Sequence, residues 1–244
     1  MKKSIPLILI FFSLFSCKSS LVNYALEKRG VFDEEVKVVS FSNNEHNVVF
    51  IPMVHVSTKL FYDDVNTKID SLKKLDYFFY FEKIKASGKN DTIVRKSMKL
   101  IELPVMKQGY KSLIDSILLK NKIKLKKEII DQPKYEKFGL DSLNSKNVDL
   151  SMVEIINYYE KKYQPIILEP CDFENEIYEK PKCPLKLSKE INDDVVLNSR
   201  NRKVIKELST ETRKKIAIIY GKGHLVGIRE ELLKMGYVEE TINK

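Results

Sequence analysis

Three residues stand where chemistry is expected, because His55, Glu82 and His224 each follow a short apolar run rich in β-branched or aromatic residues. Two imidazole nitrogens and one carboxylate are a ligand set suited to a divalent metal ion. The same groups could also divide the work of a general acid and a general base. Either use requires that residues far apart in the sequence converge in the fold.

The elements that must position these residues are buried strands. The runs 48–51, 77–81 and 216–220 are short and almost entirely apolar, which is typical of strands buried on both faces of a parallel sheet. Crossover connections return the carboxyl ends of such strands to one edge of the sheet. We therefore expect the three candidate residues to line one crevice at that edge, where ligands bind in open α/β sheets.

The turn before His224 contains two glycines that support this placement. Gly221 and Gly223 allow backbone angles with φ > 0, so the chain can turn sharply off the strand. The spacing of apolar residues predicts a helix from Leu225 that stops at Gly236. A helix N-terminus disfavours a charged imidazolium, so His224 would stay neutral, as a base or a metal ligand must.

A helix predicted over 190–208 adds an arginine and an asparagine to the candidate site. Asn201 falls on its apolar stripe and Arg200 lies beside that stripe. An arginine next to the crevice could hold a carboxylate or stabilise an oxyanion. Alternatively, the stem of Arg200 lies along the surface with its charged head in water.

The remaining pattern alternates strands and helices, so the predicted fold class is α/β, with a central, mostly parallel sheet, helices on both faces and a helical insertion at about 90–145. The expected domains are a segment 1–16 that is removed, a segment 17–30 that forms a tether, and one α/β domain over 31–244. The further expected elements are strands at 36–41, 48–51 (ended by Pro52) and 166–168, and helices at 61–75 (capped by Ser57 or Thr58) and from a cap at Asp149 to Tyr163.

The N-terminal segment is similar to a bacterial lipoprotein signal peptide. Lys2 and Lys3 precede an apolar run, which closes with Leu14-Phe15-Ser16-Cys17, a sequence that resembles a lipobox. The resemblance implies cleavage before Cys17 and attachment of acyl chains such as palmitate, which anchor the protein to a membrane of the bacterial cell envelope, facing the periplasm or the cell surface. The alternative is an uncleaved N-terminal helix, although the run is shorter than the ~20 residues of a membrane span.

Two cysteines remain besides Cys17, and they are compatible with export. Cys171 and Cys183 lie in an irregular stretch bounded by prolines. We expect them to form a disulfide in an oxidising compartment. Two free buried thiols are the alternative.

The chain of 244 residues has a formal charge of +9, spread over many lysines. The densest run, 120–127, has no interleaved aromatic residue, and lysine lacks the planar fork with which arginine reads phosphates and bases. We therefore expect no nucleic-acid partner. The run is either a solvated face or a surface that attracts anionic lipid or glycan.

Taken in order, these motifs resemble the TraB/GumN/Tiki family, which is related to the erythromycin esterase and ChaN-like proteins. The resemblance rests on Pro52-Met53-Val54-His55, the strand ending in Glu82, Arg200-Asn201, and Gly221 to His224 followed by a helix and Gly236-Tyr237. It covers roughly residues 45–240. Proline stands at position 52, where that family usually has glycine.

The resemblance implies a site built from His55, Glu82, Arg200 and His224, with a divalent metal bound by the two histidines and the glutamate. It also implies a hydrolase acting on peptide or ester bonds, since the Tiki members are described as metal-dependent proteases and the TraB members as dampening peptide pheromones. A protein of the same fold that binds and sequesters a peptide or small molecule is the alternative, and a purely structural lipoprotein is a third. The oligomeric state is left open.

Overall fold

The computed structural model describes residues 8–85, 90–104 and 109–240, and side chains from residue 18 onward, so Lys2 and Lys3 of the expected signal peptide lie outside it. The chain divides into two compact units, and the domain boundaries expected from the sequence stay a prediction. The first unit comprises Met1–Val36, Val54–Thr67 and Gln108–Pro133, and the second comprises Lys37–Met53, Lys68–Lys107 and Lys134–Lys244. The division arises because the apolar residues of the first unit form a small core of their own around Val31, Phe32, Val56 and Ile129.

A six-stranded mixed sheet organises the second unit, in the order β6-β4-β7-β2-β1-β8. The four strands β6, β4, β7 and β2 are parallel, and β1 and β8 add an antiparallel edge. This confirms the predicted α/β fold with a mostly parallel sheet. The strands are β1 Val39–Ser42, β2 Asn47–Met53, β4 Phe78–Phe81, β6 Ser145–Asn147, β7 Lys215–Gly221 and β8 Val238–Glu240.

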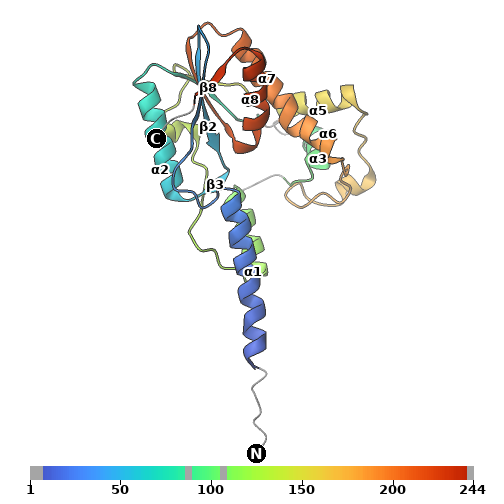
Figure 1. The fold of residues 1–244 in the computed structure, drawn as a ribbon. Helices are drawn as coiled ribbons and strands as arrows, with labels where there is room; N and C mark the ends of the chain where they lie inside the picture. The colour runs from blue at the N-terminus through green and yellow to red at the C-terminus, as the bar shows by residue number, and fades with distance from the viewer. Residues whose placement is uncertain (1–7, 86–89, 105–108, 241–244) are drawn as a thin grey trace, which may run out of the picture. The chain divides into compact units, whose positions relative to one another are not determined.

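The middle strand β7 is buried on both faces, as its all-apolar sequence predicts. Ile216, Ile218 and Tyr220 pack in one core cluster with Val204 and Ile228. The last two residues belong to the helices α7 (Ser199–Ser209) and α8 (Leu225–Lys234), which cover this face of the sheet (Figure 1). Ala217 and Ile219 point to the opposite face and are equally buried. The helix α8 stops just before Gly236, as predicted, and this glycine has a φ of 83°.

Pro52 does not end the second strand, because β2 continues through it to Met53. In β2, Pro52 is in register with Tyr220 of β7. The pairing of β2 with β1 extends only to Phe50, so no neighbouring strand on that side needs an N–H from position 52. A proline is therefore tolerated near the end of a strand that is otherwise central.

Several other expected boundaries are wrong. The helix α5 (Met152–Lys162) is capped by Ser151, which forms a capping box with Glu154, and not by Asp149. No strand forms at 166–168, since the backbone N–H of Ile166 donates to the side chain of Glu160. The helix α2 (Lys59–Lys73) is capped by Thr58 as predicted, but it ends before Leu75, which is exposed.

The predicted helix at 190–208 consists of three successive segments. An α-helical turn α6 (Lys189–Asp193) leads into a π-helical turn (Asp194–Asn198), which leads into α7. π-helical turns occur frequently at functional sites. The wider turn changes the register of the helix, and both Arg200 and Asn201 are buried immediately after it.

The region 90–145 is only partly the expected helical insertion. It contains α3 (Asp91–Ile101) in the second unit and α4 (Tyr110–Lys120) in the first, together with the short strand β5 (Ile130–Asp131). A 3₁₀ turn lies in this region at Tyr135–Phe138. Two more 3₁₀ turns lie later in the chain, at Pro170–Phe173 and Lys222–His224.

The first unit is built around the helix α1 (Ile8–Lys28), the beginning of α2, α4 and the pair of β3 (Val56–Ser57) with β5. Within the segment 17–30, expected as a tether, the chain is helical up to Lys28, and Ser19 and Asn23 hydrogen-bond to the backbone of residues 124–126. None of the helices in the described part of the chain is both long enough and apolar enough to cross a membrane.

Cys171 and Cys183 lie with their sulfur atoms at disulfide-bond distance, 1.97 Å, and their Cα atoms 6.2 Å apart. The loop between them also contacts α3, since Lys99 forms ion pairs with Glu169 and the buried Asp172. The sequence-based prediction of a cysteine pair in this stretch is thus matched by the geometry.

Replacing both cysteines with serine should lower the free energy of unfolding by about 3 kcal/mol, because the unfolded chain regains the entropy of an open loop. Chemical denaturation of the oxidised protein and the double variant measures the difference. Peptide mapping without reductant, after alkylation of the intact cells, should recover the two cysteines joined. Two alkylated free thiols would contradict the disulfide.

Candidate functional site

The candidate site lies at the carboxyl ends of three neighbouring parallel strands in the second unit. Glu82 directly follows β4, Asp149 comes two residues after β6, and His224 comes three residues after β7. The strand order β6-β4-β7 makes these ends adjacent. The topological argument from the sequence therefore placed Glu82 and His224 correctly, on one edge of the sheet.

Glu82 is held by two donors. Arg200 Nη2 donates to its Oε1, and the backbone N–H of Gly221 donates to its Oε2. Burial on its own would raise the pKa of Glu82, but the charge of Arg200 and the hydrogen bonds from Gly221 and Arg200 outweigh burial and lower it. The carboxylate is consequently ionised at neutral pH.

Gly221 serves this carboxylate through its small size rather than through an unusual backbone angle. Its φ is −52°, and Gly223 is not among the glycines with positive φ, so the predicted role of these glycines in a left-handed turn is wrong. A Cβ at position 221 would lie 3.0 Å from Glu82 Oε2. Glycine thus lets the carboxylate approach the backbone closely.

Arg200 forms a bidentate ion pair with Asp149. Its Nε and Nη2 donate to the two oxygens of Asp149, each over 2.8 Å, and both side chains are almost completely buried. Burial opposes the charge of Arg200, but the Asp149 and Glu82 carboxylates raise its pKa. The alternative in which the Arg200 head group lies in water is thereby excluded.

Asp149 is the site residue that the sequence-based prediction missed, because Asp149 was interpreted as a helix cap. The sequence does contain a signal against this interpretation. The motif Ser151-Met152-Val153-Glu154 is a capping box, which places the helix cap at Ser151, two residues after Asp149. With the cap assigned to Ser151, Asp149 becomes an acidic residue just after a strand, as Glu82 is.

His224 is buried, with 3% of its surface exposed. Its Nδ1 lies 2.7 Å from Oδ1 of Asn201, and its Nε2 lies 3.9 Å from Oε1 of Glu82. An amide oxygen only accepts, so this contact assigns the proton of a neutral ring to Nδ1 and makes Nε2 the acceptor nitrogen. The ring also packs edge-on against Tyr220 at 4.8 Å between centroids.

The Tyr220 hydroxyl adds a buried polar atom that interacts with the Asp149 carboxylate without meeting the geometry of a full hydrogen bond. The side chain is fully buried, and the Arg200 guanidinium lies over its ring. Burial and the nearby charge of Asp149 raise its pKa, so the phenol remains protonated. A buried O–H donor in this position can also donate to a ligand or an ordered water.

The formal charges of this cluster do not cancel. Glu82 and Asp149 contribute two negative charges and Arg200 contributes one positive charge. With a neutral His224, the buried site is left with one excess negative charge, which is costly in a low-dielectric interior. A proton on His224 or a bound cation would balance the excess.

His55 belongs to the first unit, whereas Glu82, Arg200 and His224 belong to the second. Its imidazole is exposed and stacks on Tyr110, with 4.4 Å between the ring centroids. Its backbone carbonyl accepts a hydrogen bond from Gln132. The convergence of His55 with Glu82 and His224 stays a prediction.

Another group of ligand atoms lies away from this site. The ligand atoms of Glu169, Cys171 and Cys183 are all within 4.8 Å of one another and could hold a metal ion. This group is not the predicted set of His55, Glu82 and His224. Its two sulfur atoms are also those of the disulfide, and only thiolates of the reduced form would serve as ligands.

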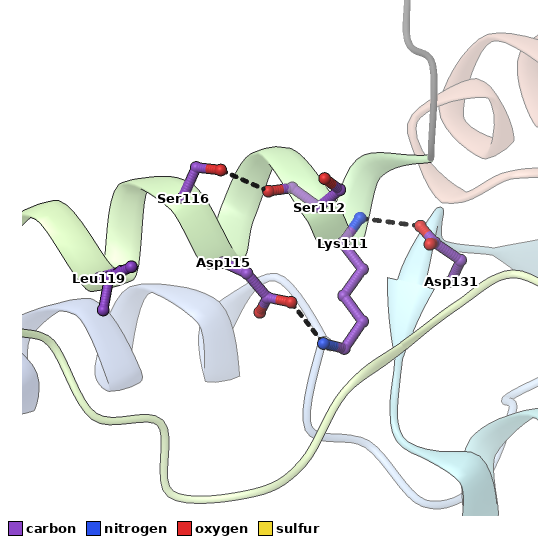
Figure 2. A pocket seen from close by; sticks show the side chains of 6 residues that line it. All are labelled: Lys111, Ser112, Asp115, Ser116, Leu119 and Asp131. Atoms are coloured by element: carbon purple, nitrogen blue, oxygen red, sulfur yellow. Dashed lines mark hydrogen bonds and ion pairs between the residues drawn. The ribbon is translucent and has the colours of Figure 1, made fainter.

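A hollow on the first unit offers less chemistry. Its acidic side chains are already engaged, since Asp115 forms an ion pair with Lys111 Nζ and Asp131 accepts from the backbone N–H of Lys111 (Figure 2). The lining residues are Lys111, Ser112, Asp115, Ser116, Leu119 and Asp131.

Comparisons of the chain with models of protein families, with curated proteins and with solved structures found no match. The resemblance to the TraB/GumN/Tiki family stays a prediction from the motifs.

Replacing Asp149 with alanine should destabilise the protein by about 3–5 kcal/mol, because Arg200 would be left buried without its bidentate partner. Thermal and chemical unfolding measure the change. Glu154→Ala, which removes the exposed capping box, is the matched control and should cost only about 1 kcal/mol. Equal effects of the two substitutions would show that Asp149 is merely another cap.

Proposed function

We propose that the protein is an envelope-anchored hydrolase, either a metal-dependent peptidase or an esterase, that acts on peptide or ester bonds. The observation that carries this proposal is the opposed pair of His224 Nε2 and Glu82 Oε1 in a buried site with excess negative charge. Both groups are proton or metal acceptors, and each is oriented by a further residue, Asn201 for His224 and Arg200 for Glu82. Such oriented pairs are typical of acid–base and metal sites.

The two donor atoms fit a divalent metal ion. Atoms bound at about 2.0–2.1 Å with a tetrahedral angle would be about 3.4 Å apart, so the observed 3.9 Å requires only a small approach. Glu82 and His224 would hold the ion, and a hydrogen bond from His224 Nδ1 to Asn201 is the usual outer contact of a ligating histidine. When bound, the metal would polarise a carbonyl group and lower the pKa of a water molecule.

Arg200 acts as a positioning residue in this proposal. Its Nε and Nη2 donate to Asp149, Nη2 also donates to Glu82, and Nη1 contacts the carbonyl of Val196. Little donor capacity is left for a substrate oxygen. The predicted role of Arg200 in stabilising developing negative charge is therefore better suited to the Tyr220 hydroxyl, which is a buried donor beside the cluster.

Without a metal, the same residues support general acid–base catalysis. Glu82 would keep a proton on His224 Nε2, and the ring would deliver or remove that proton at a substrate or a water molecule. The excess negative charge of the cluster favours this protonation. The Tyr220 hydroxyl would then donate to the substrate carbonyl oxygen.

The alternative function is binding without turnover, in which a lipoprotein of this fold sequesters a peptide or small molecule. The resemblance of the motifs to a family with both proteases and pheromone-dampening members supports either function. Turnover of a substrate by the purified protein separates them.

Metal binding and turnover should depend on the candidate pair. In the mature chain from residue 17 carrying Cys17→Ser, His224→Ala and Glu82→Gln should each weaken binding of Zn²⁺ or Mn²⁺ at least tenfold, since each removes a ligand. Calorimetric titration measures the affinity, and hydrolysis of activated esters and of a peptide library measures turnover. His55→Ala tests the predicted third ligand.

His46→Ala is the matched control for these variants, because His46 lies in the β1–β2 turn, at the opposite ends of the strands. Loss of metal binding in Glu169→Gln, with none in Glu82→Gln, would place the ion at the cysteine-containing group. Retained binding of peptides without any turnover would favour sequestration, and indifference of every assay to Glu82 and His224 would overturn the proposed site.

The anchor is tested separately. Cys17→Ser should block incorporation of labelled fatty acid and removal of the signal peptide in a bacterial host, because the thiol of Cys17 is the expected acceptor. Mass spectrometry of the membrane fraction identifies the modified N-terminus. Equal labelling of the wild type and the variant would contradict a lipid at Cys17.

A further inference from the structure

The lysine run of the first unit lies beside α1. Ser19 Oγ accepts from the backbone N–H of Lys124 over 3.2 Å, and the Asn23 side chain bonds to the backbone of Lys124 and Lys126 over 2.9 Å. Lys126 then forms an ion pair with Glu27. The contacts advance together along both segments, so residues 124–127 run in the same direction as α1.

This arrangement brings the end of α4 close to position 17. α4 lies beside α1 (Figure 1), with Ile114 and Leu26 packed in the same small core. α4 ends at Lys120, and the chain reverses in a turn at Lys122, which has φ of 53°. Because Lys124 contacts Ser19, the turn before it lies level with Cys17, which is about 3 Å farther along the helix axis.

The lysines of this run differ in whether an acidic side chain pairs with them. Lys126 and Lys127, farther from position 17, are paired with Glu27 and Glu34. Among the described residues, Lys120, Lys122 and Lys124 form no ion pair, and all three are exposed. The sequences 16–26 and 116–127 contain no acidic residue, so the positive charge here is uncompensated.

Exposed apolar side chains accompany these lysines. Leu119, directly before Lys120, is 83% exposed, and Leu21 on α1 is 68% exposed. In contrast, Ile123 and Leu125 alternate with the lysines and turn partly inward, and Leu125 packs against the small core. The alternation presents lysines to the outside, and Leu119 is not needed for packing.

We propose that this surface, defined by Leu119, Lys120, Lys122 and Lys124 and called the basic tip, binds the anionic headgroups of a phospholipid membrane. Unpaired lysines attract anionic lipid, and an exposed leucine among them can enter the interface. A nucleic acid or a glycan would leave Leu119 unexplained. The contact would give the first unit a defined orientation on the membrane surface, in addition to any lipid at Cys17, and it is independent of the proposed hydrolysis.

Vesicle flotation tests the basic tip in the mature chain from residue 17 with Cys17→Ser, so that no acyl chain contributes. The probes are vesicles of phosphatidylcholine alone and of phosphatidylcholine mixed with phosphatidylglycerol, at low and high salt. We expect binding only to the mixed vesicles, weakened by salt. Lys120→Gln, Lys122→Gln and Lys124→Gln combined should weaken it about a hundredfold at low salt, since each lysine contributes roughly a factor of five.

The matched control combines Lys161→Gln, Lys206→Gln and Lys214→Gln, which change the net charge equally at exposed positions of the second unit. Circular dichroism checks that each variant folds, and Leu119→Ser tests the apolar contribution separately. Equal losses in the two triple variants, or equal binding to both kinds of vesicle, would overturn the proposal. Binding to a soluble acidic polysaccharide with no preference for anionic vesicles would also overturn it, in favour of a glycan partner.

Discussion

The buried ion pair between Arg200 and Asp149 is the interaction on which the candidate site depends. Each partner alone would be an uncompensated charge in the interior, and together they connect α7 to the loop after β6. Nη2 of the same guanidinium also donates to Glu82 after β4, so one arginine connects the ends of two neighbouring strands. Glu82 in turn accepts from Gly221 at the end of β7. The three strand ends are thereby held in one arrangement.

The helix before β7 is irregular just before the residues of the candidate site. Arg200 and Asn201 are adjacent within α7, where successive side chains are about 100° apart. The π-helical turn at Asp194–Asn198 precedes the pair, and both Arg200 and Asn201 are buried after it. One of them orients Glu82 and the other orients His224.

The sequence was sufficient for those features that depend on local pattern and topology. Apolar runs predicted the parallel strands, and the rule that parallel strands share a carboxyl edge brought Glu82 and His224 together. Features that depend on tertiary partners could not be predicted. Asp149 was taken for a cap because its true partner is 51 residues away in the sequence. Gly221 was taken for a left-handed residue, although it is the approach of Glu82 that excludes a side chain there.

The division into two units was also beyond the sequence pattern, because segments from three parts of the chain assemble the small core around Val31 and Ile129. Local hydrophobic periodicity does not report which distant segments share a core.

The central claim is that Glu82 and His224 form one cation-binding or proton-sharing pair. A crystal structure of the mature protein grown with Zn²⁺, with anomalous diffraction measured at the zinc edge, tests it most directly. We expect an anomalous peak within bonding distance of His224 Nε2 and the Glu82 carboxylate or, if the pair shares a proton instead, no peak there and a closer contact between the same two atoms. A peak only at Glu169, or His224 turned away from Glu82, would contradict the account.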